Sequence, residues 1–449
     1  MRSPGRGARA LAVGIGVSLL VGALPAAVGA SGPASLTVLQ APADATDVVR
    51  SPGSVGGLRL YQAPISFADG RAGMLYGMNG AVSGPEGDDP FTKRVGWTAI
   101  DLGGGDTILI AGLLFVTDAP PPAGVFVDRP IVGGTGLYAG VRGVVRSTVT
   151  EDGSWEQAMQ LAGAGDPVAE TLELALGAPA GELVETGEAG LSRGDLGVSV
   201  AAVALPDGGT GLLRGTSTVV GLPLAAGDPT ATTISVSALE LGDRGTLFLA
   251  GLTRGPADGS SLAGRPASLA IIGGIGEFAG ARGQVDLIRG ADGTGTLLLT
   301  RIAVPGESPA TGAPSLVQGA MSVAADPFGT GDPIGSSPGD VWARHCTVTD
   351  ADGADVGGSY GYLTVVDTTT LVRGLGLTLI DVPGSGTIAT IGYFDDLPGT
   401  SGQGEGALPA AAVIGGTGDF AGVAGEVTNA PVTDELVQRT FTFGTLGGA

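Results

Sequence analysis

A ten-residue pattern built around two adjacent glycines occurs three times, and its spacing constrains the fold more than any other feature of this chain. The copies read IVGGTGLYAG at 131–140, IIGGIGEFAG at 271–280 and VIGGTGDFAG at 413–422. The first glycine of each pair is Gly133, Gly273 or Gly415, so the spacings are 140 and 142 residues. Units of this length have the usual size of one domain. We therefore expect three domains of one architecture.

A second signature keeps the same phase along the chain. It places an acid between two aliphatic residues, at Asp101, Glu240 and Asp381. A threonine follows each acid by six residues, and a glycine follows it by eleven. Together with the leader at the start of the chain and the points where strand alternation stops, the two signatures divide the chain into a signal peptide over 1–30, repeat 1 over 31–163, repeat 2 over 164–303, a proline- and glycine-bearing linker over 304–316, and repeat 3 over 317–449.

The periodicity inside each unit is that of β-strands. Leu375, Leu377 and Leu379 share one face of an alternating run, and residues 440–443 alternate threonine with phenylalanine. An open sheet of short strands would leave two exposed edges, and closure into a barrel removes them. We predict an all-β chain of three tandem antiparallel barrels. A two-sheet sandwich for each unit is the alternative.

The first thirty residues have the order of a secretory signal peptide. Arginines at positions 2, 6 and 9 precede an apolar run over 10–24, and small residues predominate over 26–30. This order predicts cleavage after Ala30 and export from the cell. The alternative is a membrane anchor, but the apolar run is too short to cross ~30 Å of hydrocarbon. We expect a secreted chain with no membrane partner after cleavage.

Charge and residue counts exclude several classes of function. The formal net charge is −22 and the isoelectric point is about 4.2, so the chain lacks the basic surface that binds nucleic acid. The single histidine, His345, and the single cysteine, Cys346, supply only half of a tetrahedral zinc shell. We predict no metal, no cofactor and no nucleic-acid partner. We also expect Cys346 to be buried.

The double-glycine pattern admits two interpretations. Glycine loops that bind nucleotides are followed by a helix, but residues 141–150 are rich in β-branched side chains, which favour a strand. The scaffold interpretation is therefore preferred, because glycines permit positive φ or a close approach to a neighbouring strand. The aromatic ring that follows, Tyr138, Phe278 or Phe420, is expected to anchor the hairpin on the core.

The run over 133–143, together with the strand pattern over 107–112, resembles the signature of the dirigent and allene oxide cyclase-like barrels. The resemblance implies eight-stranded antiparallel barrels with a hydrophobic cavity, which steer the cyclisation or radical coupling of small organic molecules. Barrels of this family assemble as dimers or trimers, so three in one chain imply a covalent pseudo-trimer. Repeat 3 departs from the pattern, with Ala424 where repeats 1 and 2 have Arg142 and Arg282, and Ile275 replaces threonine in repeat 2. The family's catalytic residues are not carried over, because the first half of each repeat does not match.

Aromatic residues are concentrated in the two outer repeats. Residues 35–163 and 317–449 contain nine each, whereas the middle repeat has only Phe248 and Phe278. Because small-molecule pockets are mostly apolar and aromatic, we predict that the middle barrel is a spacer filled by Leu, Val and Ala. The residues predicted to bind a small hydrophobic ligand are Tyr61, Tyr76, Trp97, Trp342, Tyr360 and Tyr393.

The candidates for acid–base chemistry are Asp101, His345, Tyr362 and Asp395. On a regular strand Asp101 shares a face with Trp97, and a carboxylate beside an indole inside a barrel would have a raised pKa. A tyrosine hydroxyl or His345 would donate to a carbonyl, and Asp395 would accept a proton. The recurrence of the acid as Glu240 in the aromatic-poor repeat favours a fold role or an outer face instead. Strand alternation likewise allows Cys346 in the wall and His345 in solvent.

Two functions follow from these observations. The first is an exported dirigent- or cyclase-like protein that binds a small hydrophobic molecule and steers its cyclisation or coupling, mainly by orientation. The second is a non-catalytic exported binding or structural module with packed barrel interiors. The sequence leaves open whether the chain is an enzyme. A cavity of roughly 300 Å³ or more in the first or third barrel favours the first function, and interiors closed by side chains favour the second.

Overall fold

The protein is described by a computed structural model over residues 34–48, 55–85, 91–117, 120–163, 168–186, 192–221, 230–256, 266–290, 292–302, 315–318, 322–326, 337–368, 372–396, 410–431 and 437–445. The predicted signal peptide and residues 304–314 of the predicted linker lie outside these ranges. Within them, every regular element is a strand except for three single-turn 3-10 helices. The all-β prediction is confirmed.

The strands of each repeat form one antiparallel sheet. Barrel 1 consists of β1 (Ser35–Gln40), β2 (Asp44–Val48), β3 (Leu58–Ser66), β4 (Ala72–Ser83), β5 (Thr92–Asp101), β6 (Thr107–Val116), β7 (Phe126–Thr135), β8 (Arg142–Val149) and β9 (Trp155–Ala162). Barrel 2 consists of β10 (Val168–Leu176), β11 (Ala180–Val184), β12 (Leu196–Ala204), β13 (Thr210–Gly221), β14 (Thr230–Glu240), β15 (Gly245–Pro256), β16 (Pro266–Gly276), β17 (Gly283–Arg289) and β18 (Gly295–Ile302). Barrel 3 consists of β19 (Ser315–Gln318), β20 (Ser322–Asp326), β21 (Val341–Thr349), β22 (Asp355–Asp367), β23 (Val372–Val382), β24 (Gly386–Asp396), β25 (Ala411–Gly416), β26 (Val423–Pro431) and β27 (Val437–Thr445).

Each barrel closes through a first strand that is split in two. β1 pairs along its length with β9, and its last two residues reach β3, where Leu39 lies opposite Ser66. β2 then continues along β3, with Asp44 opposite Gln62. β1 and β2 therefore share one position in the ring, and the barrel has eight strand positions. β10 with β11, and β19 with β20, close the other two barrels in the same way.

The domain boundaries can be compared with the strands. β9 ends at Ala162 and β10 begins at Val168, on either side of the predicted division at 163. β18 ends at Ile302, and β19 begins at Ser315. The first two residues of β19 thus belong to barrel 3 although the sequence analysis assigned them to the linker, because a short strand next to proline and glycine has no clear alternation of its own.

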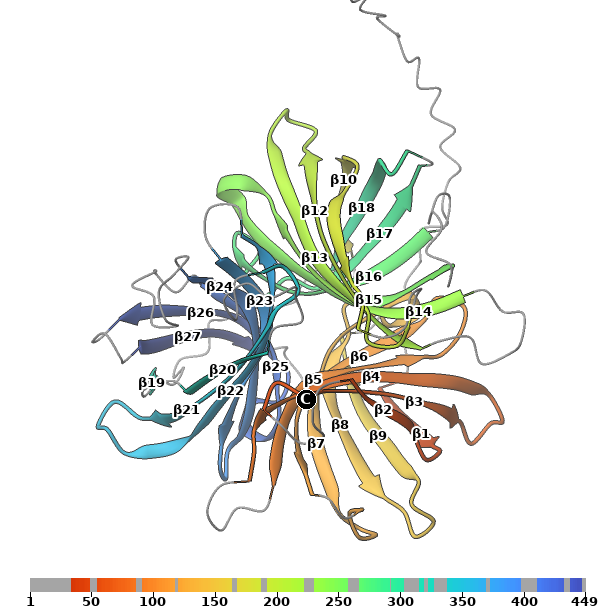
Figure 1. The fold of residues 1–449 in the computed structure, drawn as a ribbon, viewed down its shortest axis with the longest axis vertical. Coiled ribbons are helices and arrows are strands. Elements are labelled where there is room, and N and C mark those ends of the chain that lie inside the picture. The colour runs from red at the N-terminus through yellow and green to blue at the C-terminus, as the bar shows by residue number, and fades with distance from the viewer. Residues whose placement is uncertain are drawn as a thin grey trace, which may run out of the picture.

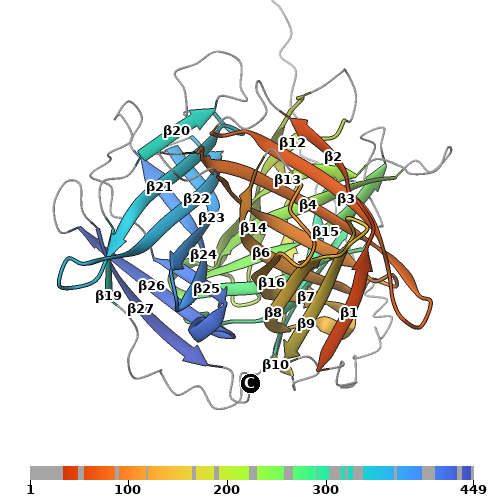
Figure 2. The same cartoon turned by 90° about the horizontal axis from the view of Figure 1, so that it is seen from below.

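The three barrels lie around a common axis. Figure 1 shows the molecule along this axis, and Figure 2 shows it from below, after a turn of 90°. One strand from each barrel reaches this axis, and β7, β16 and β25 contact one another there. These are the strands that carry the double glycines. The chain is therefore an intrachain pseudo-trimer, as the three repeats predict.

The first glycine of each pair is the point where two barrels touch. A Cβ at Gly133 would lie 3.0 Å from the Cβ of Ala270 in barrel 2, and a Cβ at Gly273 would lie 2.9 Å from Ile414 in barrel 3. A Cβ at Gly415 would lie 3.1 Å from Pro130 in barrel 1, which completes the cycle. The scaffold interpretation is confirmed, and the close approach is made by the next barrel.

The second glycine of each pair is needed within its own barrel. A Cβ at Gly274 would lie 2.4 Å from the carbonyl oxygen of Phe278, and a Cβ at Gly416 would lie at the same distance from that of Phe420. In barrels 1 and 3 the chain then turns through a 3-10 helix, η1 (Gly136–Tyr138) or η3 (Gly418–Phe420), whereas the third 3-10 helix among the described residues, η2 (Gly242–Arg244), lies between β14 and β15. Strands, not helices, follow the motif, which removes the nucleotide-loop interpretation.

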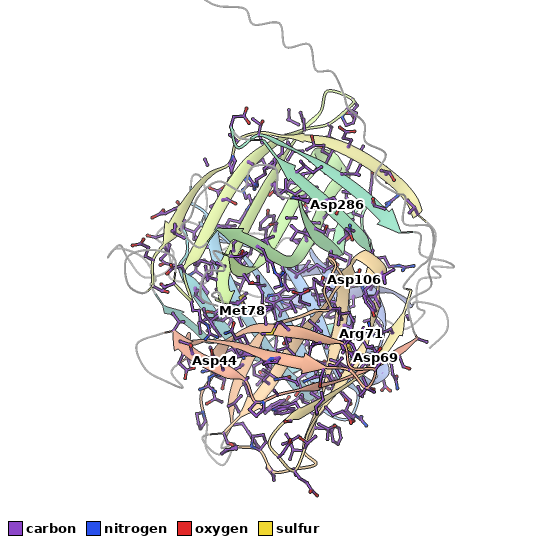
Figure 3. All side chains as sticks on the ribbon, turned by 90° about the vertical axis from the view of Figure 1, so that its right-hand side faces the viewer. Asp44, Asp69, Arg71, Met78, Asp106 and Asp286 are labelled. Atoms are coloured by element: carbon purple, nitrogen blue, oxygen red, sulfur yellow. The ribbon has the colours of Figure 1, made fainter. Side chains whose placement is uncertain are left out.

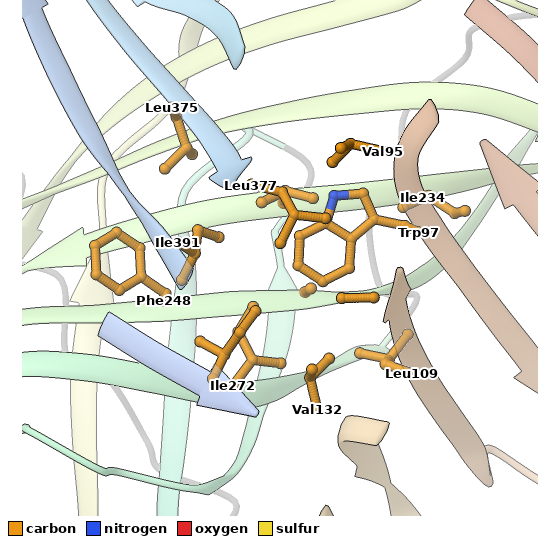
Figure 4. Packing of buried hydrophobic residues seen from close by; sticks show 14 of the residues in the cluster. Val95, Trp97, Leu109, Val132, Ile234, Phe248, Ile272, Leu375, Leu377 and Ile391 are labelled. Carbon is orange, nitrogen blue, oxygen red and sulfur yellow. The ribbon is translucent and has the colours of Figure 1, made fainter. Parts of the chain in front are cut away.

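Apolar side chains form cores inside the barrels and a separate core between them. Inside barrel 1, Ile65, Leu75 and Ile100 pack together. Between the barrels, Trp97, Phe248 and Leu377 belong to a central cluster with members from all three repeats (Figure 4). Both faces of the axial strands are thus buried, and neighbouring residues of one strand enter different cores.

Two buried arginines cross the interface between barrels 1 and 2. Arg142 is fully buried and donates from Nη2 to the carbonyl oxygens of Ile272, at 2.8 Å, and Ala281, at 3.3 Å. Arg282 donates in the opposite direction, to the carbonyl oxygen of Gly140 at 3.1 Å. Burial, together with the charge of Arg282, lowers the pKa of Arg142 to about 9. The equivalent residue of barrel 3 is Ala424, so this cross-linking is specific to the first two barrels.

Candidate functional site

A buried arginine with neutral partners occupies the interior of barrel 1. Arg129, on β7, donates to the Thr98 hydroxyl at 2.9 Å, the Ser147 hydroxyl at 3.0 Å and the Gln157 side-chain oxygen at 3.4 Å. The Tyr61 hydroxyl forms a 2.6 Å hydrogen bond with Thr98. Burial lowers the pKa of Arg129. These hydrogen-bonded polar side chains lie next to the apolar core of barrel 1 and occupy the interior of the barrel.

The strand registers identify the equivalent positions in the other two barrels. Gln157 lies opposite Ser147, just as Leu297 lies opposite Leu287 in barrel 2 and Arg439 lies opposite Asn429 in barrel 3. Arg129 of barrel 1 corresponds in the same way to Leu269 and Ala411, and Tyr61 corresponds to Ser199 and Arg344. At the Gln157 position, therefore, barrel 2 has a leucine where barrel 1 has an amide and barrel 3 has a charged side chain.

The interior of barrel 2 agrees with the prediction of a spacer. Its core consists mainly of leucine, valine, isoleucine and alanine, with Phe278 as its aromatic member. Its small polar residues satisfy one another, since the hydroxyls of Ser217 and Ser235 are 3.0 Å apart and those of Thr233 and Thr253 are 2.5 Å apart. The second aromatic residue of the repeat, Phe248, points into the central core instead.

Barrel 3 holds two arginines in its interior, and their surroundings differ from those of Arg129. Arg344 stacks on aromatic rings, with its Cζ 3.2 Å from the Phe394 centroid and 4.9 Å from that of Trp342. Arg439 lies on β27, and its buried Nε has no hydrogen-bond partner among the described residues, which is equally true of the Nε of Arg129. Burial lowers the pKa of Arg439 to about 10, against the opposing influence of Cys346.

Most of the residues predicted to line a barrel pocket point out of the barrels. Tyr61 packs on the core of barrel 1 and Trp342 packs inside barrel 3, as expected. The other four predicted ligand-binding residues face the central core between the barrels instead, which corrects the prediction: Tyr76, Trp97, Tyr360 and Tyr393. The acid–base candidate Tyr362 faces the same core. The reason is that both faces of these strands are buried, so alternation alone cannot distinguish the inside of a barrel from an interface.

A small cavity lies at this central junction. Its volume is about 40 Å³, and Trp97, Thr216 and Tyr362 supply one lining residue from each barrel. Met78 also lines it, and Figure 3 shows this side chain where barrel 1 meets its neighbours. A space of this size admits a few water molecules, far less than the several hundred Å³ of a typical ligand pocket.

The recurring acids make contacts between barrels. Asp101 accepts a hydrogen bond from Arg254 of barrel 2, and Glu240 lies 3.5 Å from Arg373 of barrel 3. Burial raises the pKa of Asp381, and the charge of Lys93 in barrel 1 opposes that rise. One acid from each barrel thus faces a cation of the next barrel. This is the fold role that recurrence suggested, and Asp101 does not lie inside barrel 1.

Further contacts reinforce the interfaces that involve barrel 2. Arg193 of barrel 2 lies 3.0 Å from Asp44, which Figure 3 labels on the sheet of barrel 1. Arg214 contacts Glu240 within barrel 2 and lies 3.1 Å from Asp367 of barrel 3. Burial and the Glu240 carboxylate raise the pKa of Tyr393 well above its ordinary value. The ion pairs of Arg193 and Arg214 therefore stabilise the contacts of barrel 2 with barrels 1 and 3.

The remaining acid–base candidates are not brought together by the fold. His345 is half-buried on β21, opposite Tyr360 of β22, on the face that looks away from the barrel interior. Cys346 is buried, as predicted, and burial raises the pKa of its thiol. Asp395 lies on β24 opposite Arg373, and its side chain is outside the described part of the chain. His345 and Cys346 therefore point in opposite directions and form no pair.

The residues missed by sequence reasoning are the inward arginines, Arg129, Arg344 and Arg439. A signal for them exists in the alternation: Arg129 is two residues before Ile131, and Arg439 is two residues before Phe441, both of which are core residues. A charged residue in phase with a core face indicates an internal polar site. In the described ranges, no group of three or more histidine, cysteine or acidic side chains is placed to hold a metal ion. Nor does any helix there combine the length and hydropathy of a membrane-spanning segment.

Comparison with known proteins gives little guidance. No family model and no curated protein matches the sequence. Among solved structures, one match is a pyocyanin demethylase with 22% sequence identity and a TM-score of 0.24. The match covers 29% of this chain and the whole of that protein. A likeness this weak carries no argument about the activity of this chain.

Proposed function

We propose that this chain is an exported, non-catalytic binding module, in which three barrels form one body and the ligand enters barrel 3. The observation that carries the proposal is the use of the acidic groups. Asp101, Glu240 and Asp381 are directed toward neighbouring barrels. The polar residues that fill the interior of barrel 1 are arginine, tyrosine, hydroxyl and amide side chains, and none of these is a carboxylate. A proton-transfer mechanism in barrel 1 would lack its base.

The different side chains in the interiors of the three barrels also support a binding function over a catalytic one. Barrel 2 is filled by aliphatic side chains, and barrel 1 by the hydrogen-bonded group around Arg129. Barrel 3 keeps cationic and aromatic side chains in its interior, with Arg344 stacked on Phe394. Barrels 1 and 2 would then act as structural support for a binding chamber in barrel 3.

Export is proposed from the leader over 1–30. The burial of the single cysteine, Cys346, is compatible with an oxidising environment because a buried thiol is shielded from oxidants. Steering of a cyclisation or coupling, which the dirigent and cyclase resemblance implies, stays a prediction. It would require an open interior in barrel 1 or barrel 3, and the filled interior of barrel 1 does not favour it.

The proposal can be tested on the mature chain purified from its own source. Native mass spectrometry should detect a non-covalent small molecule, and chromatography should recover that molecule chemically unchanged after long incubation with fresh protein. Recovery of an isomer or a coupled product would contradict the non-catalytic assignment. Absence of any bound molecule in repeated preparations would contradict the binding assignment.

A further inference from the structure

Strand β11 of barrel 2 lies at an edge of its sheet, and one side of it is open. Among the strands of the described ranges, β11 pairs only with β12. On the other side the ring neighbour is β18, but this strand begins at Gly295 opposite Leu176 of β10, so none of its residues lies opposite β11. The first four residues of β11 are exposed, and its last residue, Val184, is buried. An edge of this kind presents N–H and C=O groups to an added strand.

The hydrogen-bond pattern shows which main-chain groups of β11 are directed outward. The amide of Gly177 donates to the carbonyl oxygen of Ala202 at 2.8 Å, so the even-numbered residues of β12 present their main-chain groups to β10 and β11. Within β11, Gly181 and Leu183 lie opposite odd-numbered residues of β12. Their N–H and C=O groups therefore point away from β12, toward the open side.

Barrel 1 protects the corresponding edge with a charged pair. Strand β2 is the counterpart of β11, and Asp47 takes the place of Leu183, since Asp47 lies opposite Arg59 as Leu183 lies opposite Gly197. Nε and Nη2 of Arg59 donate to the Asp47 carboxylate at 2.7 and 2.8 Å. Charged side chains are a usual protection of edge strands against pairing with a further strand.

Barrel 2 has an apolar side chain and open space at these positions. Leu183 is 50% exposed, and a Cβ added to Gly197 would meet no atom closer than 3.8 Å. The adjacent Glu182 is exposed on the other face of the strand. An added antiparallel strand would therefore meet a leucine on one face and a carboxylate on the other, which favours apolar and basic residues in alternation.

Charge distinguishes between two sources of such a strand. The chain has a formal net charge of −22, so a second copy would be repelled, and antiparallel pairing of two β11 strands about Glu182 would place their carboxylates opposite each other. We propose that β11 binds an extended peptide segment of a partner protein, with alternating basic and apolar residues, as an added antiparallel strand. Main-chain hydrogen bonds to Gly181 and Leu183 would supply affinity, and the alternating side chains would supply specificity. This inference does not depend on the ligand proposed for barrel 3.

The test measures the fluorescence anisotropy of a dye-labelled peptide, GKVKVKG, titrated with the full mature chain. The wild-type chain should bind one peptide, with its valines opposite Gly181 and Leu183 and its central lysine opposite Glu182. N-methylation of the two valine amides removes the donors that face β11 and should weaken binding at least about tenfold. N-methylation of the lysine amides, which face away from β11, is the matched control and should leave binding nearly unchanged. The acidic peptide GEVEVEG should bind at least about tenfold more weakly than GKVKVKG.

Variants of the chain test the same contacts from the other side. Leu183→Pro removes an outward N–H and no hydrogen bond to β12, which is where edge strands tolerate proline. This variant should bind GKVKVKG at least about tenfold more weakly than wild type. Glu182→Gln should weaken binding about two- to fivefold. Asp47→Pro, at the corresponding position of barrel 1, is the matched control and should leave binding unchanged. Circular dichroism and thermal unfolding establish that each variant is folded.

Hydrogen exchange on the wild-type chain keeps the test decisive if Leu183→Pro does not fold. With GKVKVKG bound, the amides of Gly181 and Leu183 should exchange at least about tenfold more slowly than in the free chain. No binding by wild type, equal binding of the valine-methylated peptide, full binding by a folded Leu183→Pro variant, or protection confined to other strands would each overturn the inference. Slow exchange of these two amides in the free chain would also overturn it, because another segment of the chain would then cover the edge. So would a dimer of the wild-type chain that Leu183→Pro abolishes, because the added strand would then come from a second copy.

Discussion

The pseudo-threefold axis and the barrel interiors are two regions in which the three repeats behave differently. At the axis the repeats are nearly interchangeable, since Gly133, Gly273 and Gly415 each contact the next barrel in the same way. In the interiors they diverge, since Gln157, Leu297 and Arg439 occupy one equivalent position. The recurring sequence signature therefore encodes assembly, and differences among the copies indicate where a barrel does something of its own.

The largest effect is expected from moving the interior residue of one barrel into another. Leu297→Arg places a guanidinium among the leucines of barrel 2, where the neighbouring core residues are apolar. An unpaired buried charge of this kind should destabilise the chain by more than about 4 kcal/mol. The free energy of unfolding, from urea titration, measures the loss. Leu297→Met is the control and should cost less than about 1.5 kcal/mol; a stable, soluble arginine variant would show that barrel 2 is no more packed than barrel 3.

A smaller loss is expected when the cross-link that distinguishes barrels 1 and 2 is removed. Arg142→Ala makes barrel 1 resemble barrel 3 at this position and leaves the carbonyls of Ile272 and Ala281 without their donor. The expected loss is about 2–3 kcal/mol in the free energy of unfolding. Arg146→Ala, on the same strand but half-exposed, should cost no more than about 1 kcal/mol. Equal effects of the two variants would contradict the role of Arg142 between barrels.

The axis itself is tested with a single methyl group. Gly273→Ala forces a Cβ against Ile414 and Ala412 of barrel 3, and overpacking at such a contact should cost about 1–2 kcal/mol. Gly84→Ala adds the same group where no atom lies within 4 Å, and it should leave the melting temperature unchanged. Differential scanning calorimetry compares the two. A Gly273 variant as stable as the Gly84 variant would mean that the barrels do not rely on close contact at the axis.

The smallest effect concerns the pH dependence of the acids between barrels. The pKa of Asp381 is raised by burial, so between the unfolded and folded pKa values the folded state holds a proton that the unfolded state has lost. Stability therefore falls as the pH rises through the folded pKa. Asp381→Asn should therefore be more stable than wild type near pH 7 by about 0.5 kcal/mol. The advantage should vanish as the pH falls below the unfolded value of the carboxyl pKa. Urea unfolding at several pH values measures it.

A contrasting acid provides the control for that profile. Arg59 lowers the pKa of Asp47 through a 2.7 Å hydrogen bond from its Nε. Asp47→Asn should lose stability at pH 7 and approach wild type at low pH, which is the opposite sign. Profiles of the same sign for the two variants would contradict the assignment of burial as the cause at Asp381.

Much of the fold could be predicted from the sequence, because it depends on repetition and local pattern. The period of the double glycine gave three units, and alternation with turn residues indicated closed sheets of short strands. The edge problem of an open sheet favoured the barrel, which the strand pairing confirms. The start of β19 was placed two residues late, since short strands beside proline and glycine carry little alternation.

The site was harder to predict for a specific physical reason. Trp97 and Tyr76 sit on strands whose two faces are both buried, one in a barrel and the other against a neighbouring barrel. Both faces of such a strand are then hydrophobic. Strand alternation separates the residues into two faces, but it does not show which face lines the barrel interior. The inward arginines were detectable in principle, because each is in phase with core residues of its own strand.

The amino-acid order alone determined that the chain folds as three copies of one antiparallel unit, because glycine spacing and side-chain alternation are properties of the backbone and its nearest neighbours. Only the tertiary structure decided which face of each strand lines the interior of a barrel and which face packs against a neighbouring barrel. That choice depends on closing each sheet and seating it against two others, and such long-range contacts leave no mark in a local pattern. The same closure placed Arg439 on the inward face of barrel 3, at a position where the other two barrels have the neutral residues Gln157 and Leu297.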